Sequence, residues 1–311
     1  MKKKIKKILV VLGGTSRERK VSLDSGKACL KAIKKLGYKV DTHDPAKKSL
    51  NEIDKKSVDL IFNALHGKDG EDGIAQSYFE YLRIPYTHSG VLSSMNAMDK
   101  EISKYFFKKV KILTPKYFVL NSKKFEKKDL KKSILKNKIS YPVVIKPTNE
   151  GSSIGVVICN NYNKLCKVFI SSKKIYKKLI IEEFINGQEI QVAVMKNKAL
   201  GAIELKPKRI FYDYKAKYSK AAKTEHIMPA NISKKNYNKV LRIAEKAHKT
   251  LNCKGVTRSD FKLFKNKFYL LEINTQPGMT NLSLVPEIAK YKKISFEYLV
   301  KKIILDASIN R

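Results

Sequence analysis

The chain has 311 residues and carries a formal net charge of +38. Its length suits two or three lobes that share a cleft, and a hydrophobic share of 43% argues against wholesale disorder. Only seven of the 66 basic residues are arginine, and the lysines are spread along the whole chain. Because proteins that read nucleic acids depend on arginine for bidentate contacts, we interpret the charge as a solvated surface and expect no nucleic-acid partner.

The N-terminal segment combines a lysine run with an apolar stretch, as a secretory signal does. The apolar stretch covers only residues 8–12, whereas a signal needs roughly 7–15 apolar residues, so we predict a first buried strand instead. No apolar run approaches the about 18 residues of a membrane span. The four cysteines lack Cys-x-x-Cys spacing, which favours reduced core thiols. We therefore expect a cytoplasmic protein with no membrane partner.

The first part of the chain, residues 1–96, alternates expected strands and helices. The pattern predicts a strand at 8–12, a helix from Ser22, its expected cap, to Gly37, a strand at 58–65, a glycine-dotted loop at 66–73 and a helix from Ile74. Strand–loop–helix repeats predict an α/β lobe with a parallel sheet, whose loops after the strands are available to ligands.

Two more lobes are expected, at residues 97–181 and 182–311. The central lobe is predicted to contain a helix at 100–109, a strand at 116–120, a helix at 129–137, a strand at 143–146 and a glycine-rich turn at 148–155. A strand at 179–183 leads into the last lobe, with predicted strands at 189–195 and 201–205, a polar segment at 206–224, a helix at 234–251 and a hairpin at 256–274.

The most informative stretch is the second half of that hairpin region, residues 258–274. It predicts two strands joined by a turn at residues 265–267. A turn centred on the middle residue of these three places Asp260 directly opposite Glu272. Since side chains alternate with period two, one face then carries Arg258, Asp260, Glu272 and Asn274.

Two carboxylates that face each other, Asp260 and Glu272, repel and do not stabilise a hairpin by themselves. Hard divalent cations bind such oxygen clusters, and Mg²⁺ commonly takes one or two carboxylates together with substrate phosphates. We therefore predict a metal site there. Lys262 on the same face leaves open the alternative of a solvated face with chance acids.

A series of motifs follows the chain from one end to the other. They are Leu12-Gly-Gly-Thr-Ser-x-Glu-Arg-x-Val-Ser22, Ala64-Leu-His-Gly67 with Gly70-Glu-Asp-Gly73, Met98-Asp-Lys100, Lys146-Pro-x-x-Glu-Gly-Ser-Ser-x-Gly155, Phe211-Tyr-Asp-Tyr-x-Ala-Lys-Tyr218 and Glu272-x-Asn-x-x-Pro-Gly-Met-Thr280. In this order they resemble the motifs of the D-alanine–D-alanine ligase family of ATP-grasp enzymes. A single motif would be weak, but the ordered set covers nearly the whole chain.

The resemblance implies an α/β protein with α+β lobes, namely a three-lobed ATP-grasp fold with an N-terminal parallel-sheet (pre-ATP-grasp) domain. It implies ligation of two D-alanine molecules through a D-alanyl phosphate, at the expense of ATP, for peptidoglycan precursor synthesis. ATP would lie between the second and third lobes with two Mg²⁺ or Mn²⁺ ions. Dimers are common in the family, so a homodimer is an expectation.

The resemblance also implies a nucleotide site. Lys100 and Lys146 match the lysines that hold the phosphates, and the loop 150–155, with Ser153, would close over them through its amides. Glu182 matches the residue that accepts from the adenine amino group. The remaining expected cofactor-binding residues are Phe184 and Ile185 against the adenine plane, Glu189 at the ribose hydroxyls, Glu183 and Lys217. The metal ligands implied are Asp260, Glu272 and Asn274.

The expected catalytic residues come from all three lobes. Glu18 matches the acid that pairs with the ammonium of the first D-alanine, although a helix-capping acid is its plainer interpretation. Arg258 and the amide of Gly278 match the donors to the tetrahedral oxyanion. Ser283 and Lys217 match contacts to the carboxylate of the second D-alanine. His66 lies near the reacting groups in the family, but a loop histidine is more often structural.

The polar segment 206–224 is predicted to be a lid, because long loops in compact domains are lids or disordered. In the resembled family a lid tyrosine bonds a serine of the phosphate loop and the acid of the first lobe. Here these are Tyr218, Ser152 and Glu18, and a disordered insertion is the alternative.

Two other functions stay open. One is an ATP-grasp ligase with D-lactate or D-serine as acceptor, which would leave the metal and phosphate residues unchanged. The other is a lysine-rich nucleic-acid-binding protein, which requires clustered arginine and exposed aromatic residues. The motif set departs little from the family, and Gln276 lies at a position that we expect to vary.

Overall fold

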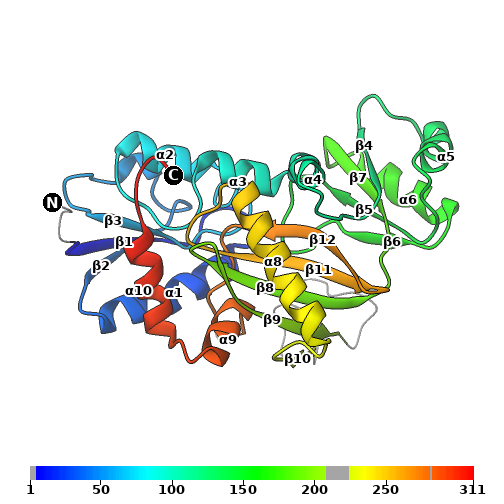
Figure 1. Ribbon diagram of the computed structural model, residues 1–311. Coiled ribbons are helices and arrows are strands. Elements are labelled where there is room, and N and C mark those ends of the chain that lie inside the picture. Colours follow the sequence, from blue (N-terminus) through cyan, green and yellow to red (C-terminus); the bar gives the residue numbers. More distant parts are fainter. Residues whose placement is uncertain (1–4, 208–223, 281) are drawn as a thin grey trace.

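The computed structural model describes residues 5–207, 224–280 and 282–311. The strands of these segments form three sheets, of three, four and five strands. Figure 1 shows them in one elongated molecule, with the three-stranded sheet at the N-terminal end, the four-stranded sheet at the opposite end and the five-stranded sheet between them. The mixed α/β class and the parallel first sheet agree with the sequence prediction.

The N-terminal sheet is parallel, in the order β2-β1-β3, and consists of β1 (Lys7–Val11), β2 (Lys39–His43) and β3 (Leu60–Asn63). Its helices are α1 (Arg19–Lys35), α2 (Ile74–Leu82) and α3 (Val91–Met98), with a short 3₁₀ helix at Leu50–Glu52. The prediction that Ser22 caps α1 was wrong, since the helix begins at Arg19. The Ser22 hydroxyl instead accepts from Gly13 N at 2.8 Å and donates to Ala64 O at 2.7 Å, which joins the loops after β1 and β3.

The four-stranded sheet is antiparallel, in the order β4-β7-β5-β6, and consists of β4 (Tyr117–Asn121), β5 (Val143–Pro147), β6 (Val157–Cys159) and β7 (Lys178–Glu183). Its helices are α4 (Lys100–Lys109), α5 (Lys127–Lys136) and α6 (Tyr162–Ser172). Asp99 starts α4 by accepting from the backbone of Glu101 and Ile102, as an N-cap does. Because Lys100 and Lys104 are four residues apart, one face of α4 carries both.

The five-stranded sheet is antiparallel, in the order β10-β9-β8-β11-β12. It consists of β8 (Gln188–Met195), β9 (Lys198–Lys206), β10 (Glu225–Ile227), β11 (Val256–Phe264) and β12 (Lys267–Asn274). Its helices, with those that end the chain, are α8 (Lys234–Thr250), α9 (Leu284–Tyr291) and α10 (Phe296–Asp306).

The β11–β12 hairpin has the predicted facing residues but not the predicted turn. Only Lys265 and Asn266 lie between the strands, and both have positive φ, so the turn is one residue shorter than expected. That shift alone would misalign the acids, but the register shifts by one at Asp260/Phe261. This irregularity restores the pairing of Asp260 with Glu272.

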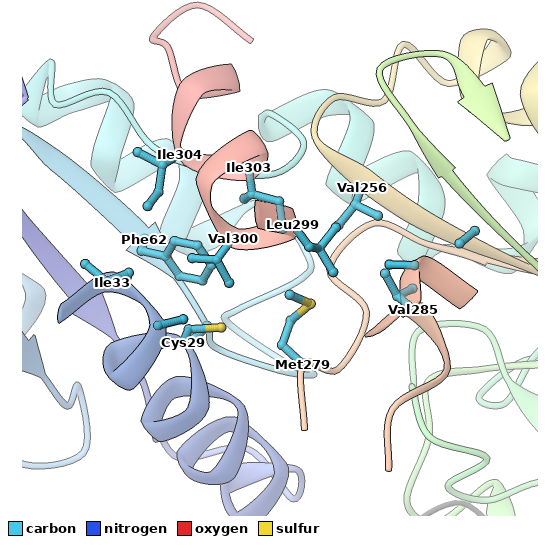
Figure 2. Close-up of a cluster of buried hydrophobic side chains, with 14 of the residues drawn as sticks. Cys29, Ile33, Phe62, Val256, Met279, Val285, Leu299, Val300, Ile303 and Ile304 are labelled. Atoms are coloured by element: carbon cyan, nitrogen blue, oxygen red, sulfur yellow. The ribbon is translucent and has the colours of Figure 1, made fainter. Parts of the chain in front are cut away.

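The largest hydrophobic core joins the two ends of the chain. Phe62 of the first sheet and Cys29 and Ile33 of α1 pack with Val300 and Ile303 of α10. Figure 2 shows these side chains around a common centre, with Met279 reaching into it from the loop after β12. That loop is therefore anchored in the core.

None of the helices within the described segments has both the length and the apolar character needed to cross a membrane.

Candidate active site

Two neighbouring pockets form one cleft. The first, which we call the strand pocket, is lined mainly from β5, β7, β8, β11 and β12: Lys100, Val144, Lys146, Pro147, Glu150, Ser153, Ile154, Val156, Glu182, Glu183, Phe184, Ile185, Glu189, Asp260, Lys262, Leu271 and Glu272. The second, the junction pocket, is lined from around all three sheets; we call the surroundings of the three-, four- and five-stranded sheets the first, second and third lobes. Its lining residues are Glu71, Ala97, Met98, Lys100, Glu150, Gly151, Ser152, Arg258, Glu272, Ile273, Asn274 and Thr275. Since Lys100, Glu150 and Glu272 line both, the pockets are continuous.

A buried cluster of three charges lies at one wall of the strand pocket, and two of its members, Glu182 and Lys146, line the pocket. Glu182 on β7 binds Lys146 of β5 through Oε1, and its Oε2 lies 3.0 Å from Nζ of Lys104 on α4. All three side chains are at least nine-tenths buried. Burial opposes ionisation of Glu182, but Lys104 and Lys146 outweigh it and lower the pKa of the carboxyl group. Glu182 is thus held as a carboxylate that faces the pocket.

Two other acids of the strand pocket are also partnered. Glu189 of β8 lies 2.9 Å from Nζ of Lys262 on β11. Glu183 accepts from the backbone nitrogen of Lys116 at 3.0 Å. Lys262, which left a chance acidic face open as an alternative, therefore belongs to a paired, pocket-lining set.

The candidate metal ligands lie where the two pockets meet. Asp260 accepts two hydrogen bonds from Arg258, at 2.7 and 2.9 Å, and Glu272 lies 3.5 Å from Nζ of Lys100. Asn274 Oδ1 accepts from the backbone nitrogen of Gln276 at 2.8 Å. Two carboxylates and an amide oxygen on adjacent strands fit a hard divalent cation, and each carboxylate is already beside a positive charge.

Across the described residues, no three His, Cys, Asp or Glu side chains gather into a metal cluster. The set at Asp260, Glu272 and Asn274 has only two carboxylates. A cation there would need further oxygen ligands from a bound substrate or water.

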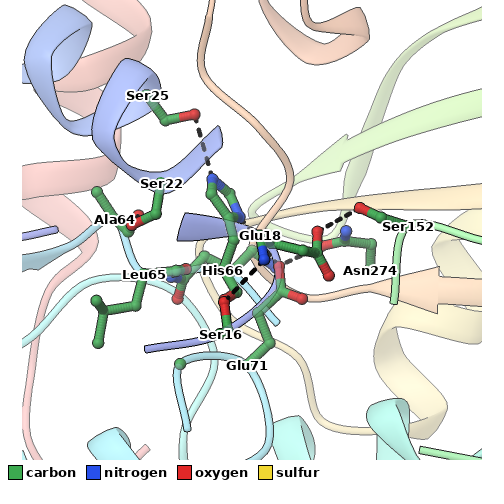
Figure 3. A network of polar contacts seen from close by, with 12 residues as sticks. Ser16, Glu18, Ser22, Ser25, Ala64, Leu65, His66, Glu71, Ser152 and Asn274 are labelled. Atoms are coloured by element: carbon green, nitrogen blue, oxygen red, sulfur yellow. Dashed lines mark hydrogen bonds and ion pairs between the residues drawn. The ribbon is translucent and has the colours of Figure 1, made fainter. Parts of the chain in front are cut away.

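The junction pocket depends on contacts between lobes. The hydroxyl of Ser152, in the loop after β5, donates to Oε2 of Glu18 at the start of α1 (Figure 3). A side chain at Gly151 would come within 2.5 Å of Glu18 Oε1, so this close approach requires glycine. Glu18 occupies the N-cap position of α1, as the helix-capping interpretation expected, but its side chain makes no capping hydrogen bond and is 5% exposed. The side chain instead contacts Ser152.

His66 lies at the centre of a hydrogen-bonded network in the first lobe. Its Nδ1 is 3.2 Å from Glu71 Oε1, and its Nε2 is 3.2 Å from Ser25 Oγ on α1 (Figure 3). Ser25 Oγ also accepts from Met279 N at 3.0 Å. The network therefore fixes the loop after β12 against the first lobe.

Gly278 is held by this arrangement beside Ser283. A side chain at Gly278 would come within 2.9 Å of Ser283 Oγ, which accepts from Thr280 N at 2.9 Å. The backbone of Gly278 and the hydroxyl of Ser283 thus lie together at the start of α9.

Gln276 is buried between the first and third lobes. Its side chain accepts from Asn63 Nδ2 at 2.8 Å and donates to Leu65 O. Asn63 ends β3 and also donates to Gly70 O at 3.3 Å. The expectation that this position merely varies overlooked a contact between residues more than 200 apart in sequence.

The structure brings most of the expected residues into one cleft, but two of them lie outside the described residues. These are Lys217 and Tyr218, so the lid prediction stays a prediction. Sequence reasoning missed Lys104, although its spacing of four from Lys100 on an expected helix was visible. It also missed Ser25, for which no local signal existed, and it gave no role to Glu71, although Glu71 stands in the motif Gly70-Glu-Asp-Gly73.

Family models match most of the chain. A model described as D-ala D-ala ligase C-terminus matches residues 106–305, and one described as D-ala D-ala ligase N-terminus matches residues 39–89. The D-alanine–D-alanine ligase of Pelagibacter ubique (strain HTCC1062) is 58% identical over 306 residues, which cover 98% of this chain and 99% of that protein. The D-alanine–D-alanine ligase of Wolbachia pipientis wMel is 45% identical over 305 residues, covering 96% and 94%.

Solved structures agree with these relatives. The D-alanine–D-alanine ligase of Bacillus anthracis has a TM-score of 0.86 and 32% identity, with 97% of each chain covered. The same enzyme complexed with ATP has a TM-score of 0.84 and 28% identity over 97% of each chain. The VanG D-Ala:D-Ser ligase of Enterococcus faecalis has a TM-score of 0.83 and 27% identity over 97% of this chain and 99% of that one.

Full-length similarity to these ligases, together with the cleft formed by the two pockets, identifies the protein as a member of the D-alanine–D-alanine ligase family with an ATP-grasp fold.

Proposed function

We propose that the cleft joins two D-alanine molecules in an ATP-dependent reaction that supplies peptidoglycan precursors. The observation that carries this proposal is the continuity of the two pockets at Lys100, Glu150 and Glu272. One end is the larger of the two and is lined by strands, which suits a nucleotide. The other is small and polar, as two amino acids require. The γ-phosphate would lie between them.

In this assignment the strand pocket binds ATP. Lys100 and Lys146 hold the phosphates, and the loop with Ser153 covers them. Glu182 accepts a hydrogen bond from the adenine amino group, and Glu189 binds the ribose hydroxyls. The remaining contacts to the base come from Glu183, Phe184 and Ile185.

Asp260, Glu272 and Asn274 would hold Mg²⁺, or Mn²⁺ in its place, in two positions. The bound ions supply charge neutralisation between the phosphates. Each carboxylate already lies beside Arg258 or Lys100. These two side chains would therefore neutralise phosphate charge together with the metal ions, and they would stay close to the transferring phosphoryl group.

The reaction has two steps. A carboxylate oxygen of the first D-alanine attacks the γ-phosphorus, the bond to ADP breaks, and D-alanyl phosphate forms. The amine of the second D-alanine then attacks the acyl carbon, and the amine loses a proton as phosphate leaves. Glu18 binds the ammonium group of the first D-alanine. Arg258 and the amide of Gly278 stabilise the oxyanion, and Ser283 binds the second carboxylate.

The three segments 1–96, 97–181 and 182–311 act as functional lobes in this proposal. The first supplies the D-alanine site, and the other two supply the nucleotide site. Lys217 and Tyr218 belong to a lid that completes it, with Tyr218 beside Ser152 and Glu18. A cytoplasmic location suits a reaction that consumes ATP, and the four cysteines are free and buried.

We also propose a homodimer. Exposed apolar side chains lie along α2, α3 and α4, which follow one another on one side of the molecule (Figure 1). They are Ile74, Tyr81, Leu92, Met95, Ile102 and Tyr105. Sedimentation of the wild type and of Tyr81→Glu tests this, because a monomeric wild type contradicts it.

An activity panel tests the main proposal. Purified protein with ATP and Mg²⁺ should release ADP and phosphate when D-alanine is added, and should form D-alanyl-D-alanine. L-alanine should not substitute. The panel includes D-serine and D-lactate as acceptors, which decides between the ligase activities that share this fold. Folded protein without D-alanine-dependent ADP release would contradict the proposal.

A further inference from the structure

Lys104 is a lysine that the proposed reaction does not use. It is 0% exposed and does not line the strand pocket, so it cannot reach a bound nucleotide directly. Burying an ammonium group is costly unless it is paired, and burial lowers the pKa of Lys104 while Glu182 opposes this. Replacing a whole buried ion pair by well-packed apolar side chains is often neutral or stabilising, so packing alone does not require the Lys104–Glu182 pair. The charge at this position therefore calls for a role.

The surroundings of Lys104 point to a single partner. Its Nζ lies 3.0 Å from Glu182 Oε2 and 5.3 Å from the centre of the Tyr117 ring, which also favours a cation. Tyr117 is the strand neighbour of Glu182 on β4. Lys104 thus contacts Glu182 without lining the pocket, and it lies on a helix that is capped by Asp99.

The second cation beside Glu182 has another task. Lys146 lines the strand pocket, and in the proposed function it also binds phosphate. A lysine that turns toward a phosphate neutralises Glu182 less. Lys104 has no such alternative and is the permanent counter-ion.

We infer that Lys104 is a positioning residue for base recognition, which keeps Glu182 ionised and aimed so that the site selects a 6-amino purine. The inference rests on the proposed function, in which Glu182 accepts from the adenine amino group. A carboxylate accepts from that amino group but repels the carbonyl oxygen found at the same place in hypoxanthine. A protonated carboxylic acid, in contrast, donates to that oxygen, so losing the ionised form relaxes selectivity.

The test compares ATP with ITP, which carries a carbonyl oxygen in place of the amino group. The readout is the ratio of kcat/KM for the two nucleotides in D-alanine-dependent phosphate release. We expect Lys104→Met to lower the ATP preference about tenfold, the size of one hydrogen bond to a charged group. Lys108→Met, on the exposed side of the same helix, is the matched control and should keep the wild-type ratio.

Glu182→Gln separates this inference from the function on which it rests. An amide can donate or accept, so Glu182→Gln should lose the ATP preference as well. If the wild type is inactive, the proposed function fails. The preference for a 6-amino purine can then still be measured as the ratio of the ADP and IDP dissociation constants by calorimetry. If Glu182→Gln keeps the wild-type preference, the placement of Glu182 at the amino group fails, and the role of Lys104 fails with it.

The double variant Lys104→Met/Glu182→Gln covers the case in which Lys104→Met does not fold. It removes both charges of the Lys104–Glu182 pair, so it should be more stable than Glu182→Gln, which leaves Lys104 buried with no carboxylate beside it. Because Lys104 acts only through Glu182, its nucleotide ratio should equal that of Glu182→Gln. A folded Lys104→Met with the wild-type ratio, or a double variant that differs from Glu182→Gln in that ratio, would overturn the inference.

Discussion

The strand pocket and the junction pocket are built in different ways. In the strand pocket, Glu182 and Glu189 are each paired with a lysine on the neighbouring strand of the same sheet. Beside the junction pocket, Glu18 meets the lining residue Ser152, and Asn63 meets Gln276, which follows the lining residue Thr275; the partners in each contact come from different lobes. Strand register therefore fixes the charge pairs of the strand pocket, whereas the packing of the lobes fixes the contacts beside the junction pocket. Changes in the two pockets should have different consequences.

The largest effect is expected at Glu272, where the pockets meet. Glu272→Gln keeps the size of the side chain but removes a carboxylate that faces the proposed metal and phosphate positions. Turnover should fall by about 10³ or more, and the Mg²⁺ concentration needed for activity should rise, because charge neutralisation of the phosphates is lost.

Steady-state rates against Mg²⁺ concentration measure this effect. Glu225→Gln, an exposed acid at the far edge of the same sheet, is the control and should behave as the wild type. Near-normal turnover of Glu272→Gln at limiting Mg²⁺ would mean that the metal lies elsewhere.

The next comparison uses two adjacent serines. Ser152 lines the junction pocket and Ser153 lines the strand pocket, and both have positive φ, so alanine meets the same backbone strain at either position. Ser152→Ala should raise KM for D-alanine about tenfold, because it breaks the contact with Glu18. Ser153→Ala should raise KM for ATP instead. The same change in both variants would show that the two pockets are not separate.

The hairpin shows how far sequence pattern predicts a site. Period-two alternation placed Asp260 and Glu272 on one face, and the structure agrees. The turn was predicted one residue too long, and only a register irregularity at Asp260/Phe261 restores the pairing. Such an irregularity depends on how both strands meet the rest of the sheet, because β11 also pairs with β8.

The sequence pattern did not predict residues whose contacts join distant parts of the fold. The spacing of Lys100 and Lys104 was visible, but the burial of Lys104 depends on how α4 packs against the four-stranded sheet. The contact of Asn63 with Gln276 joins segments 213 positions apart and has no local pattern. Tertiary packing decides both, so neither contact could be predicted from local sequence pattern.

A smaller effect is expected from Gln276. Gln276→Leu removes the amide that joins the loop after β12 to Asn63 and Leu65. KM for D-alanine should rise severalfold while KM for ATP changes by less than about twofold, because only the junction between lobes is loosened. The control is Gln76→Leu, which removes a buried amide that bonds Gly70 within the first lobe. Equal changes in both KM values for Gln276→Leu would argue against a role limited to the junction.

The smallest effect concerns His88, which lies at the packing contact between the first lobe and the segment before β11. A side chain at Gly255 would come within 2.9 Å of His88 Cα, and the His88 ring meets Phe62 edge to face at 5.9 Å. Among the described residues no group hydrogen-bonds His88 Nδ1. Burial lowers the pKa of His88 to about 3, and repulsion from Arg311 and His66 acts in the same direction.

The unfolded chain binds a proton at His88 near its ordinary pKa of 6.5, whereas the folded chain does so only near pH 3. Between these values the unfolded state holds more protons, so the free energy of unfolding falls as the pH falls, by up to about 1.4 kcal/mol per pH unit.

His88→Asn tolerates the positive φ of 69° and removes this proton uptake. Melting temperatures at pH 7.5 and pH 5.5 should therefore differ less in the variant than in the wild type. Burial also lowers the pKa of His248, to about 4, so replacing His248 should reduce the pH dependence of the melting temperature in a similar way. His248 lies inside the third lobe, so it serves as the comparison for His88, which lies at a contact between segments. If His88→Asn keeps the full wild-type difference between the two pH values, the buried histidine at the junction does not set the acid sensitivity of this protein.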